Sequence, residues 1–239
     1  MGASRLPGKP LEMLGGKPLI IRVYEQARKV AGIDEVVVAT DSQEILRAVE
    51  ANGGRAVLTR SDHTSGSDRV AEAADLMGAD LIINLQGDEP FSVPSDIEAV
   101  VAQLTRSPDA IVTMDFKIQT VEQWHDPSVV KVVKSAKGQA LYFSRSPIPF
   151  SHGAEDALTL ARGHIGIYGY HREILKKMAD TPPAPLELSE RLEQLRAMSI
   201  GIPVYVTEAS GAPMGIDTPA DLAEARERIQ ELGSEAFPG

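Results

Sequence analysis

Two cations lie in a short loop near the start of the chain, within Ser4-Arg5-Leu6-Pro7-Gly8-Lys9-Pro10. A glycine lets backbone N–H groups approach phosphate oxygens, and the side chains of Arg5 and Lys9 would neutralise the phosphate charge. The segment lacks the G-x-x-x-x-G-K-[ST] spacing of a P-loop. The residue types therefore leave two interpretations open: a phosphate-binding loop, or a solvated start of the chain.

A carboxylate pair is the second candidate. Asp88 follows an apolar run at 81–85, within Asn84-Leu85-Gln86-Gly87-Asp88-Glu89-Pro90, and Asp217 lies in Gly215-Ile216-Asp217-Thr218-Pro219. Ligands of open α/β sheets bind outside the carboxyl ends of the strands. Mg²⁺ takes one or two protein carboxylates and completes its shell with water and phosphate, so this pair would suffice. The alternatives are an acidic turn for Asp88 and a helix N-cap for Asp217.

The elements that must position these residues alternate between strand and helix up to residue 109. We expect strands at 35–39, 55–58 and 81–85, and helices at 18–30, 43–51, 68–77 and 94–104. Such alternation is typical of a parallel sheet with helices on its faces. Residues 35–39 and 81–85 should then be neighbouring parallel strands of one sheet.

The pattern changes after Ala110. Strands are expected at 111–118, 129–133, 140–144 and 165–170 with few helices between them, and a surface loop at 153–162. A helix at 187–198, a strand at 204–206 and a helix at 217–232 complete the chain. We predict a three-layer α/β fold whose sheet is mixed but mostly parallel, with a smaller antiparallel lobe. The parts would be 1–109, 110–200 and 201–239.

Composition excludes several classes of protein. The 239 residues are 43% hydrophobic and 24% charged, which is the balance of a globular protein. The net charge of −10 argues against binding to nucleic acid or to an anionic membrane. Without cysteine there is no disulfide, thiolate nucleophile or cysteine zinc site. Apolar runs are too short to span a bilayer and the first residues do not resemble a signal peptide, so we expect a cytoplasmic location.

Several segments together resemble the nucleotide-sugar cytidylyltransferases. They occur in family order and cover essentially the whole chain: Arg5-Leu6-Pro7-Gly8-Lys9-Pro10-Leu11, 59–69 (TRSDHTSGSDR), 84–90 (NLQGDEP), 129–133 (VVKVV), 140–145 (ALYFSR), 164–170 (HIGIYGY), 192–196 (LEQLR) and 215–219 (GIDTP). The segments at 140–145 and 164–170 are similar to the branch of the family that uses 3-deoxy-manno-octulosonate (Kdo). The resemblance implies a Rossmann-like nucleotidyltransferase fold and a homodimer.

The resemblance also implies a reaction and a nucleotide site. CTP and Kdo would give CMP-Kdo and pyrophosphate for lipopolysaccharide biosynthesis, with Mg²⁺ as the cofactor. Lys9, Asp88 and Asp217 match catalytic positions, and the two aspartates match the metal-binding pair. Arg5 matches the triphosphate-binding loop. The cytosine and ribose pocket would be formed by Thr64, Ser65, Gly66 and Arg69, with Gln86 beside it.

The sugar site implied by the resemblance falls in the second lobe. The positions that match it are Arg145, His164, Tyr168, Glu193 and Gln194. Each has a plainer interpretation: His164 and Tyr168 as core residues with satisfied polar tips, and Glu193 with Arg196 as a solvated i, i+3 pair. Trp124, the only tryptophan, is expected to pack rather than to stack on a ligand.

The chain differs from the family in one respect. The family's apolar first strand and the Pro-Ala-Arg turn after it have no match before Met1. We therefore expect exposed strand edges and weaker triphosphate binding. Two alternatives remain: a cytidylyltransferase for another sugar acid, such as a sialic-acid-like substrate, or a nucleotide-binding subunit without catalytic activity.

Overall fold

The computed structural model describes residues 6–63 and 65–239, apart from the side chains at 154, 155 and 234. The chain forms two compact units that do not follow chain order. The first unit contains the residues up to 79, together with 84–98 and 213–239, and the second contains 80–83 and 99–212. Helix α4 (Pro94–Arg106) begins in the first unit and ends in the second.

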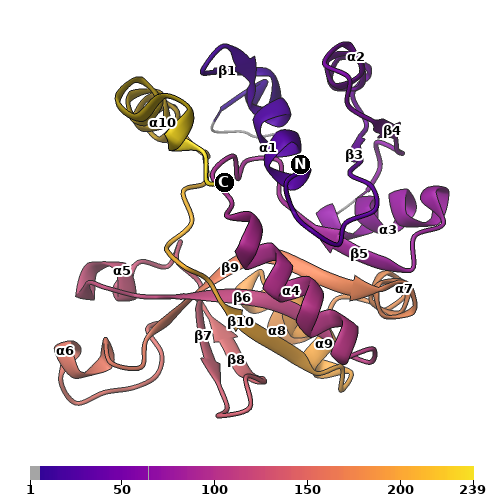
Figure 1. Cartoon of the computed structure of the whole chain (residues 1–239). Coiled ribbons are helices and arrows are strands. Elements are labelled where there is room, and N and C mark those ends of the chain that lie inside the picture. Colours follow the sequence, from indigo (N-terminus) through magenta and orange to yellow (C-terminus); the bar gives the residue numbers. More distant parts are fainter. Residues whose placement is uncertain (1–5, 64) are drawn as a thin grey trace. The chain divides into compact units, whose positions relative to one another are not determined.

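The first unit is built from short strands and longer helices (Figure 1). Strands β3 (Val38–Thr40) and β4 (Ala56–Leu58) pair in parallel, and β1 (Met13–Leu14) pairs antiparallel with β2 (Lys17–Pro18). The helices are η1 (Lys9–Leu11), α1 (Leu19–Ala27), α2 (Gln43–Ala51), α3 (Gly66–Met77), α10 (Pro219–Leu232) and η2 (Gly233–Ala236).

Side-chain caps fix the starts of three of these helices. Ser42 accepts a hydrogen bond from the backbone N–H of Ile45 at the start of α2, and Ser65 does the same for Asp68 in α3. Thr218 caps α10 in a capping box with Asp221. Each cap satisfies a backbone donor that the first turn of a helix leaves without an intrahelical partner.

The second unit contains a six-stranded mixed sheet with the strand order β10-β6-β9-β7-β8, and β5 pairs with β9 (Figure 1). Its strands are β5 (Leu81–Asn84), β6 (Ile111–Lys117), β7 (Lys131–Lys134), β8 (Ala140–Ser144), β9 (Arg162–His171) and β10 (Val204–Glu208). β10 runs parallel to β6, whereas the β6–β9, β7–β9 and β7–β8 pairs are antiparallel.

Helices pack on this sheet where small residues allow close approach. A Cβ on Gly169 of β9 would lie 3.1 Å from side-chain atoms of Leu104 and Val100 on α4, so a side chain here would require these neighbours to shift. The remaining helices of the unit are α5 (Val121–His125), α6 (Ala154–Ala157), α7 (Arg172–Ala179), α8 (Pro185–Glu190) and α9 (Gln194–Ser199).

The α/β architecture is confirmed, but the predicted sheet is wrong in two respects. The sheet of the second unit is largely antiparallel, not mostly parallel, and the strands after Ala110 belong to that sheet together with β5. The strands expected at 35–39 and 81–85 are not neighbours, since β3 pairs with β4 and β5 pairs with β9.

Helix prediction was wrong in the second unit. The single helix expected at 187–198 is two helices, α8 and α9, because Arg191 adopts a left-handed conformation with φ 55°. Helices α5 and α7 were not predicted, and α6 occupies part of the expected loop at 153–162. Among the described residues, no helix has the length and apolar character needed to cross a membrane.

Candidate active site

The first unit brings Lys9, Asp88 and Asp217 together, although 79 and 208 residues separate Lys9 from the two aspartates. The ammonium Nζ of Lys9 donates to Asp88 Oδ2 at 2.7 Å and to Asp217 Oδ1 at 2.9 Å. The Lys9 side chain is largely buried, with 11% of its surface exposed, while Asp217 remains 56% exposed. The three residues predicted to be catalytic therefore form one cluster that is open on the Asp217 side.

A shared core positions the three side chains. Leu6, Phe91 and Ile216, which lie close in sequence to Lys9, Asp88 and Asp217, pack in one hydrophobic cluster. The backbone N–H of Ile216 donates to the carbonyl of Asp88 at 2.9 Å and ties the two acidic segments together. Gly8 has φ 71°, a left-handed conformation that glycine adopts at little cost, and directly precedes Lys9 at the start of η1.

The N-cap interpretation of Asp217 is wrong. The cap of α10 is Thr218, whose side chain accepts from the N–H of Asp221 at 3.2 Å. The carboxylate of Asp221 in turn accepts from the backbone N–H groups of Asp217 and Thr218, both at 2.8 Å. Because the helix is capped without the Asp217 carboxylate, capping does not explain why this side chain is acidic.

The surroundings of the cluster shift the pKa values of Lys9 and of the neighbouring Glu89. Burial lowers the pKa of Lys9, but the hydrogen bonds to Asp88 and Asp217 outweigh it, so the pKa lies above the usual value. Burial, reinforced by the charges of Asp88 and Asp217, raises the pKa of Glu89 to about 7. Glu89 is a third carboxyl group in the cluster's field that the sequence analysis did not single out. Its position next to Asp88 was the available signal.

The two aspartates suit one cation. Both carboxylates reach the same Lys9 ammonium within 2.9 Å, so their oxygens converge on a point where a positive charge is stable. No group of three or more metal-ligating side chains is present among the residues that the structure describes. Mg²⁺ needs no more than one or two protein carboxylates when phosphate and water complete its shell. Asp88 and Asp217 therefore fit a magnesium site that a phosphate ligand completes.

The nucleotide-site candidates lie at the start of α3 and in the turn after β5. Ser65 caps α3, Gly66 is its first residue and Arg69 lies in its first turn. Arg69 donates to Thr59 Oγ1 at 2.6 Å and to Asp41 Oδ2 at 2.9 Å. Gln86 is exposed in the turn that carries Asp88. Arg5 and Thr64 lie outside the described residues.

The second unit brings His164 and Tyr168 together on β9, with ring centroids 5.4 Å apart. Thr113 Oγ1 lies 2.9 Å from His164 Nε2, and its single proton is directed at the carbonyls of Ile165 and Ile167. Thr113 therefore accepts from Nε2–H, which leaves Nδ1 as a hydrogen-bond acceptor. Burial lowers the pKa of His164 to about 3, so the ring is neutral at physiological pH.

Glu193 and Gln194 stand where α9 begins, with Glu193 as its N-cap residue. Burial raises the pKa of Tyr168 well above its usual value, and the charges of Tyr170 and Glu193 add to this effect. Gln194 is buried, and its amide Nε2 has no hydrogen-bond partner among the described residues. An unpaired buried N–H costs free energy, so a ligand acceptor would explain this orientation.

The solvated pair expected between Glu193 and Arg196 is wrong. Arg196 is buried, and its guanidinium binds both carboxylate oxygens of Glu187, at 2.8 Å from Nε and 2.5 Å from Nη2. It also donates to the backbone carbonyls of Met178 and Thr181. This ion pair joins α8 to α9 across the break at Arg191. The packing role of Trp124 is confirmed, because it is buried and donates to the carbonyl of Ile148.

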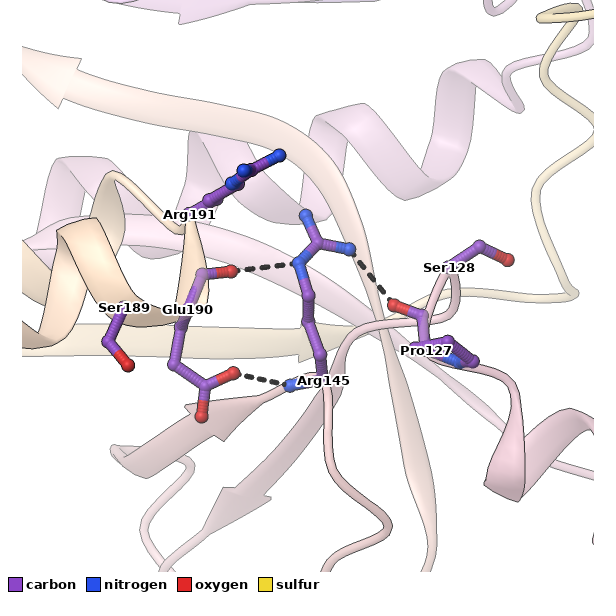
Figure 2. A pocket seen from close by; sticks show the side chains of 6 residues that line it. All are labelled: Pro127, Ser128, Arg145, Ser189, Glu190 and Arg191. Carbon is purple, nitrogen blue, oxygen red and sulfur yellow. Dashed lines mark hydrogen bonds between the residues drawn. The ribbon is translucent and has the colours of Figure 1, made fainter.

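Arg145 lines a pocket of about 500 Å³ in the second unit with Pro127, Ser128, Ser189, Glu190 and Arg191. Figure 2 shows its guanidinium held between two backbone carbonyls, that of Glu190 at 2.8 Å and that of Pro127 at 2.9 Å. The Glu190 carboxylate accepts from the backbone N–H of Arg145 and from Ser144. The lining carries two guanidinium groups, those of Arg145 and Arg191, and one carboxylate, that of Glu190, so the pocket suits an anionic group.

Lys131 is a residue that the sequence analysis missed. It is fully buried on β7, and its ammonium donates to the carbonyl of Asp126 at 2.8 Å. Burial lowers its pKa, and the charge of Arg145 acts in the same direction, partly opposed by Asp126 and Glu190. The signal in the sequence was a lysine inside the apolar run 129–133, because burying a charge costs free energy unless it is paired or hydrogen-bonded.

Comparisons with known proteins give the family of the chain. The family described as cytidylyltransferase matches residues 1–208. The 3-deoxy-manno-octulosonate cytidylyltransferase of Escherichia coli is 46% identical over 98% of this chain and 95% of its own length. That of Thioalkalivibrio sulfidiphilus is 45% identical over 96% of this chain and 94% of its own.

Solved structures point the same way. A CMP:2-keto-3-deoxy-manno-octonic acid synthetase complexed with CTP superposes with a TM-score of 0.91 at 44% identity, covering 96% of this chain and 95% of that one. A putative glucose-1-phosphate thymidylyltransferase from Bacillus anthracis, 15% identical with a TM-score of 0.67 over 99% of this chain and 95% of that one, shares the fold. The chain belongs to the 3-deoxy-manno-octulosonate cytidylyltransferases, within the cytidylyltransferase family.

Proposed function

We propose that this chain transfers CMP from CTP to Kdo and releases pyrophosphate, as a step of lipopolysaccharide biosynthesis. The observation that carries the proposal is the convergence of Lys9, Asp88 and Asp217 on one point in a chain of this family. The anomeric hydroxyl of the sugar attacks the α-phosphorus, the bond to the β-phosphate breaks, and pyrophosphate leaves with the electron pair. Such transfers depend chiefly on positioning and charge neutralisation.

Each residue of the cluster has a distinct part in this proposal. Asp88 and Asp217 would hold Mg²⁺, which would neutralise phosphate charge and favour the ionised form of the attacking hydroxyl. Lys9 keeps its proton because its pKa is raised, so it can donate to a phosphate oxygen at any physiological pH.

Ser65, Gly66 and Arg69 would bind the cytosine and ribose, with Gln86 beside them. Arg5 would bind the triphosphate and Thr64 would complete the base pocket.

The sugar acid would be bound by groups of the second unit. Arg145, in a lining with two guanidinium groups and one carboxylate, would bind the carboxylate of Kdo. The neutral imidazole of His164, the hydroxyl of Tyr168, the carboxylate of Glu193 and the unpaired amide of Gln194 would hydrogen-bond to the sugar hydroxyls. Neutral acceptors and donors suit hydroxyl groups, which carry no charge and need directed hydrogen bonds.

We also propose that the chain assembles into a homodimer and that it acts on CTP in the cytoplasm. The second unit exposes large apolar side chains, among them Phe150 at 81% and Leu160 at 70%. Apolar surface of this kind is stabilised when a second copy covers it. Sedimentation at micromolar concentration should give a species of twice 25.7 kDa, and a purely monomeric boundary would count against the dimer.

A pyrophosphate-release assay tests the reaction. The chain is incubated with CTP, Mg²⁺ and a panel of sugar acids that includes Kdo and a sialic acid. We expect release with Kdo and little with the others. Release only with another sugar acid would favour a different cytidylyltransferase, and CTP binding without release from any sugar would favour a non-catalytic nucleotide-binding subunit.

A further inference from the structure

The connection between β4 and α3 carries charged side chains that differ sharply in exposure. Arg60 and Asp62 pair with each other in solvent, with 68% and 70% of their side chains exposed. His63 keeps only 8% of its side chain exposed, and its Nε2 forms a hydrogen bond with the carboxylate of Glu72 on α3. His63 therefore turns inward, whereas Arg60 and Asp62 face solvent.

Glu72 and Arg69, one turn apart on α3, hold the backbone of the same residue. The N–H of Arg60 donates to Glu72 Oε2 at 3.1 Å and to Oε1 at 3.3 Å. Nη1 of Arg69 lies 3.4 Å from the carbonyl of Arg60 and 2.6 Å from Thr59 Oγ1. The hydrogen bond between His63 and Glu72 adds a contact to the same helix three residues further along the chain. The connection is thus fastened to the helix at residues 59, 60 and 63.

The fastened segment leads directly into the nucleotide candidates. Ser65 and Gly66 follow His63 by two and three residues, and Arg69 lies on the helix face that holds Arg60. We propose that His63 is a positioning residue for CTP. Its bond to Glu72 fixes the chain that presents Ser65 and Gly66 to the base and ribose. This inference rests on the proposed function of those two residues.

The contacts also show why loss of His63 need not unfold the unit. Without the imidazole, the carboxylate of Glu72 still accepts the N–H of Arg60, so no buried charge is left without a partner. The Ser65 cap and the Arg69 bonds to Thr59 are independent of His63. The expected loss is order in residues 61–63, 65 and 66, which affects ligand affinity before it affects stability.

The test compares three variants of the full chain: His63→Ala, His63→Gln and Asp62→Ala. Calorimetry gives the Kd for CTP in the absence of sugar, and the pyrophosphate assay gives kcat and the KM of each substrate. We expect His63→Ala to raise the Kd and KM for CTP roughly tenfold, the effect of losing one hydrogen bond to a charged group. The KM for Kdo and kcat should change less than twofold.

Two variants separate positioning from a merely structural role. His63→Gln retains a side-chain N–H donor, so CTP affinity should return to within threefold of the parent. Asp62→Ala removes an exposed partner in the same connection and should leave CTP affinity unchanged. A lower Tm for His63→Ala with an unaltered Kd for CTP would overturn the proposal.

A second position keeps the test decisive if His63→Ala does not fold. Glu72→Gln preserves an acceptor for Arg60 but removes the carboxylate that His63 contacts, and it should weaken CTP binding about threefold; an unchanged Kd would overturn the inference. A parent that binds no CTP would contradict the proposed function itself. A parent and variants that bind CTP equally well would contradict only the role of His63.

Discussion

The two candidate sites differ in how their polar groups are balanced. In the first unit, Lys9 is paired with Asp88 and Asp217, so charge is compensated by charge. In the second, His164 is neutral and the amide of Gln194 has no partner among the described residues. The contrast fits two tasks: phosphate chemistry needs charges that can be exchanged between partners, whereas the hydroxyl groups of a sugar need donors and acceptors already oriented, with Arg145 left for the carboxylate.

The balance has different consequences for stability. A charged cluster whose members satisfy one another costs little when the ligand is absent, because each ion has a partner. A buried amide that lacks one destabilises the fold by about 1–3 kcal/mol until a ligand accepts its hydrogen bond. Removing the Gln194 amide should therefore weaken binding while leaving the fold as stable as before or more stable.

The largest effect is expected in the charged site. Asp88→Asn and Asp217→Asn each remove one negative charge at nearly constant volume, so turnover should fall about 10²- to 10³-fold at saturating Mg²⁺ and CTP. Stability should hardly change, since Thr218 caps α10. Asp75→Asn, an exposed carboxylate on α3, is the matched control for turnover. Activity of Asp217→Asn within threefold of the parent would refute its role.

The neutral site gives the next largest effect. Gln194→Met keeps the side-chain volume but deletes the unpaired amide, so the KM for Kdo should rise about 10- to 30-fold while the KM for CTP stays constant. The free energy of unfolding, measured in urea, should stay equal or increase because an unsatisfied donor is gone. A destabilised variant with an unchanged KM for Kdo would mean that Gln194 serves the fold rather than the sugar.

A substitution at Gly66, with a smaller expected effect, distinguishes a ligand contact from a structural role at the nucleotide site. A Cβ on Gly66 would meet no atom of the described structure within 4 Å, so Gly66→Ala should leave stability unchanged or slightly higher. If the base or ribose packs against this backbone, the methyl group should weaken CTP binding about fivefold. Gly211→Ala, at an exposed glycine with equally open space, is the control. Equal CTP affinity for the two variants would contradict the assignment of Gly66.

The sequence predicted local elements well where a cap or a strand pattern was self-contained. Helix α2 matches the expected 43–51 because Ser42 caps it, and β8 matches the expected 140–144. Arg191 shows the opposite case, since a left-handed arginine breaks a pattern that reads as one continuous helix. That conformation occurs beside the buried Glu187–Arg196 pair, which forms only in the folded chain.

Long-range pairing set the limit for both sheet and site. The apolar run at 81–85 identified a strand, but nothing in its residues indicated β9 as the partner. Likewise the types of Lys9, Asp88 and Asp217 indicated phosphate and metal chemistry, whereas the insertion of the ammonium between the carboxylates depends on the core around Leu6, Phe91 and Ile216. Residue type reports which chemistry is available, and only the packed chain sets distances.

The last prediction tests whether the imidazole of His164 is neutral in the folded chain. Burial holds the pKa of His164 at about 3 in the folded chain, against about 6.5 for an unfolded chain. Between these values the unfolded state binds a proton that the native state does not. The free energy of unfolding should therefore fall as the pH drops from 6.5 towards 3, with a slope of up to about 1.4 kcal/mol per pH unit from this group.

His164→Gln removes that contribution, so its unfolding free energy should fall less steeply than that of the parent between pH 6.5 and pH 4.5. Urea unfolding at a series of pH values measures both slopes, and His152→Gln, which replaces an exposed histidine, should keep the slope of the parent. Equal slopes for His164→Gln and the parent would mean that the imidazole accepts a proton in the native state. The second site would then carry a switchable charge, and its contrast with the Lys9 cluster would be lost.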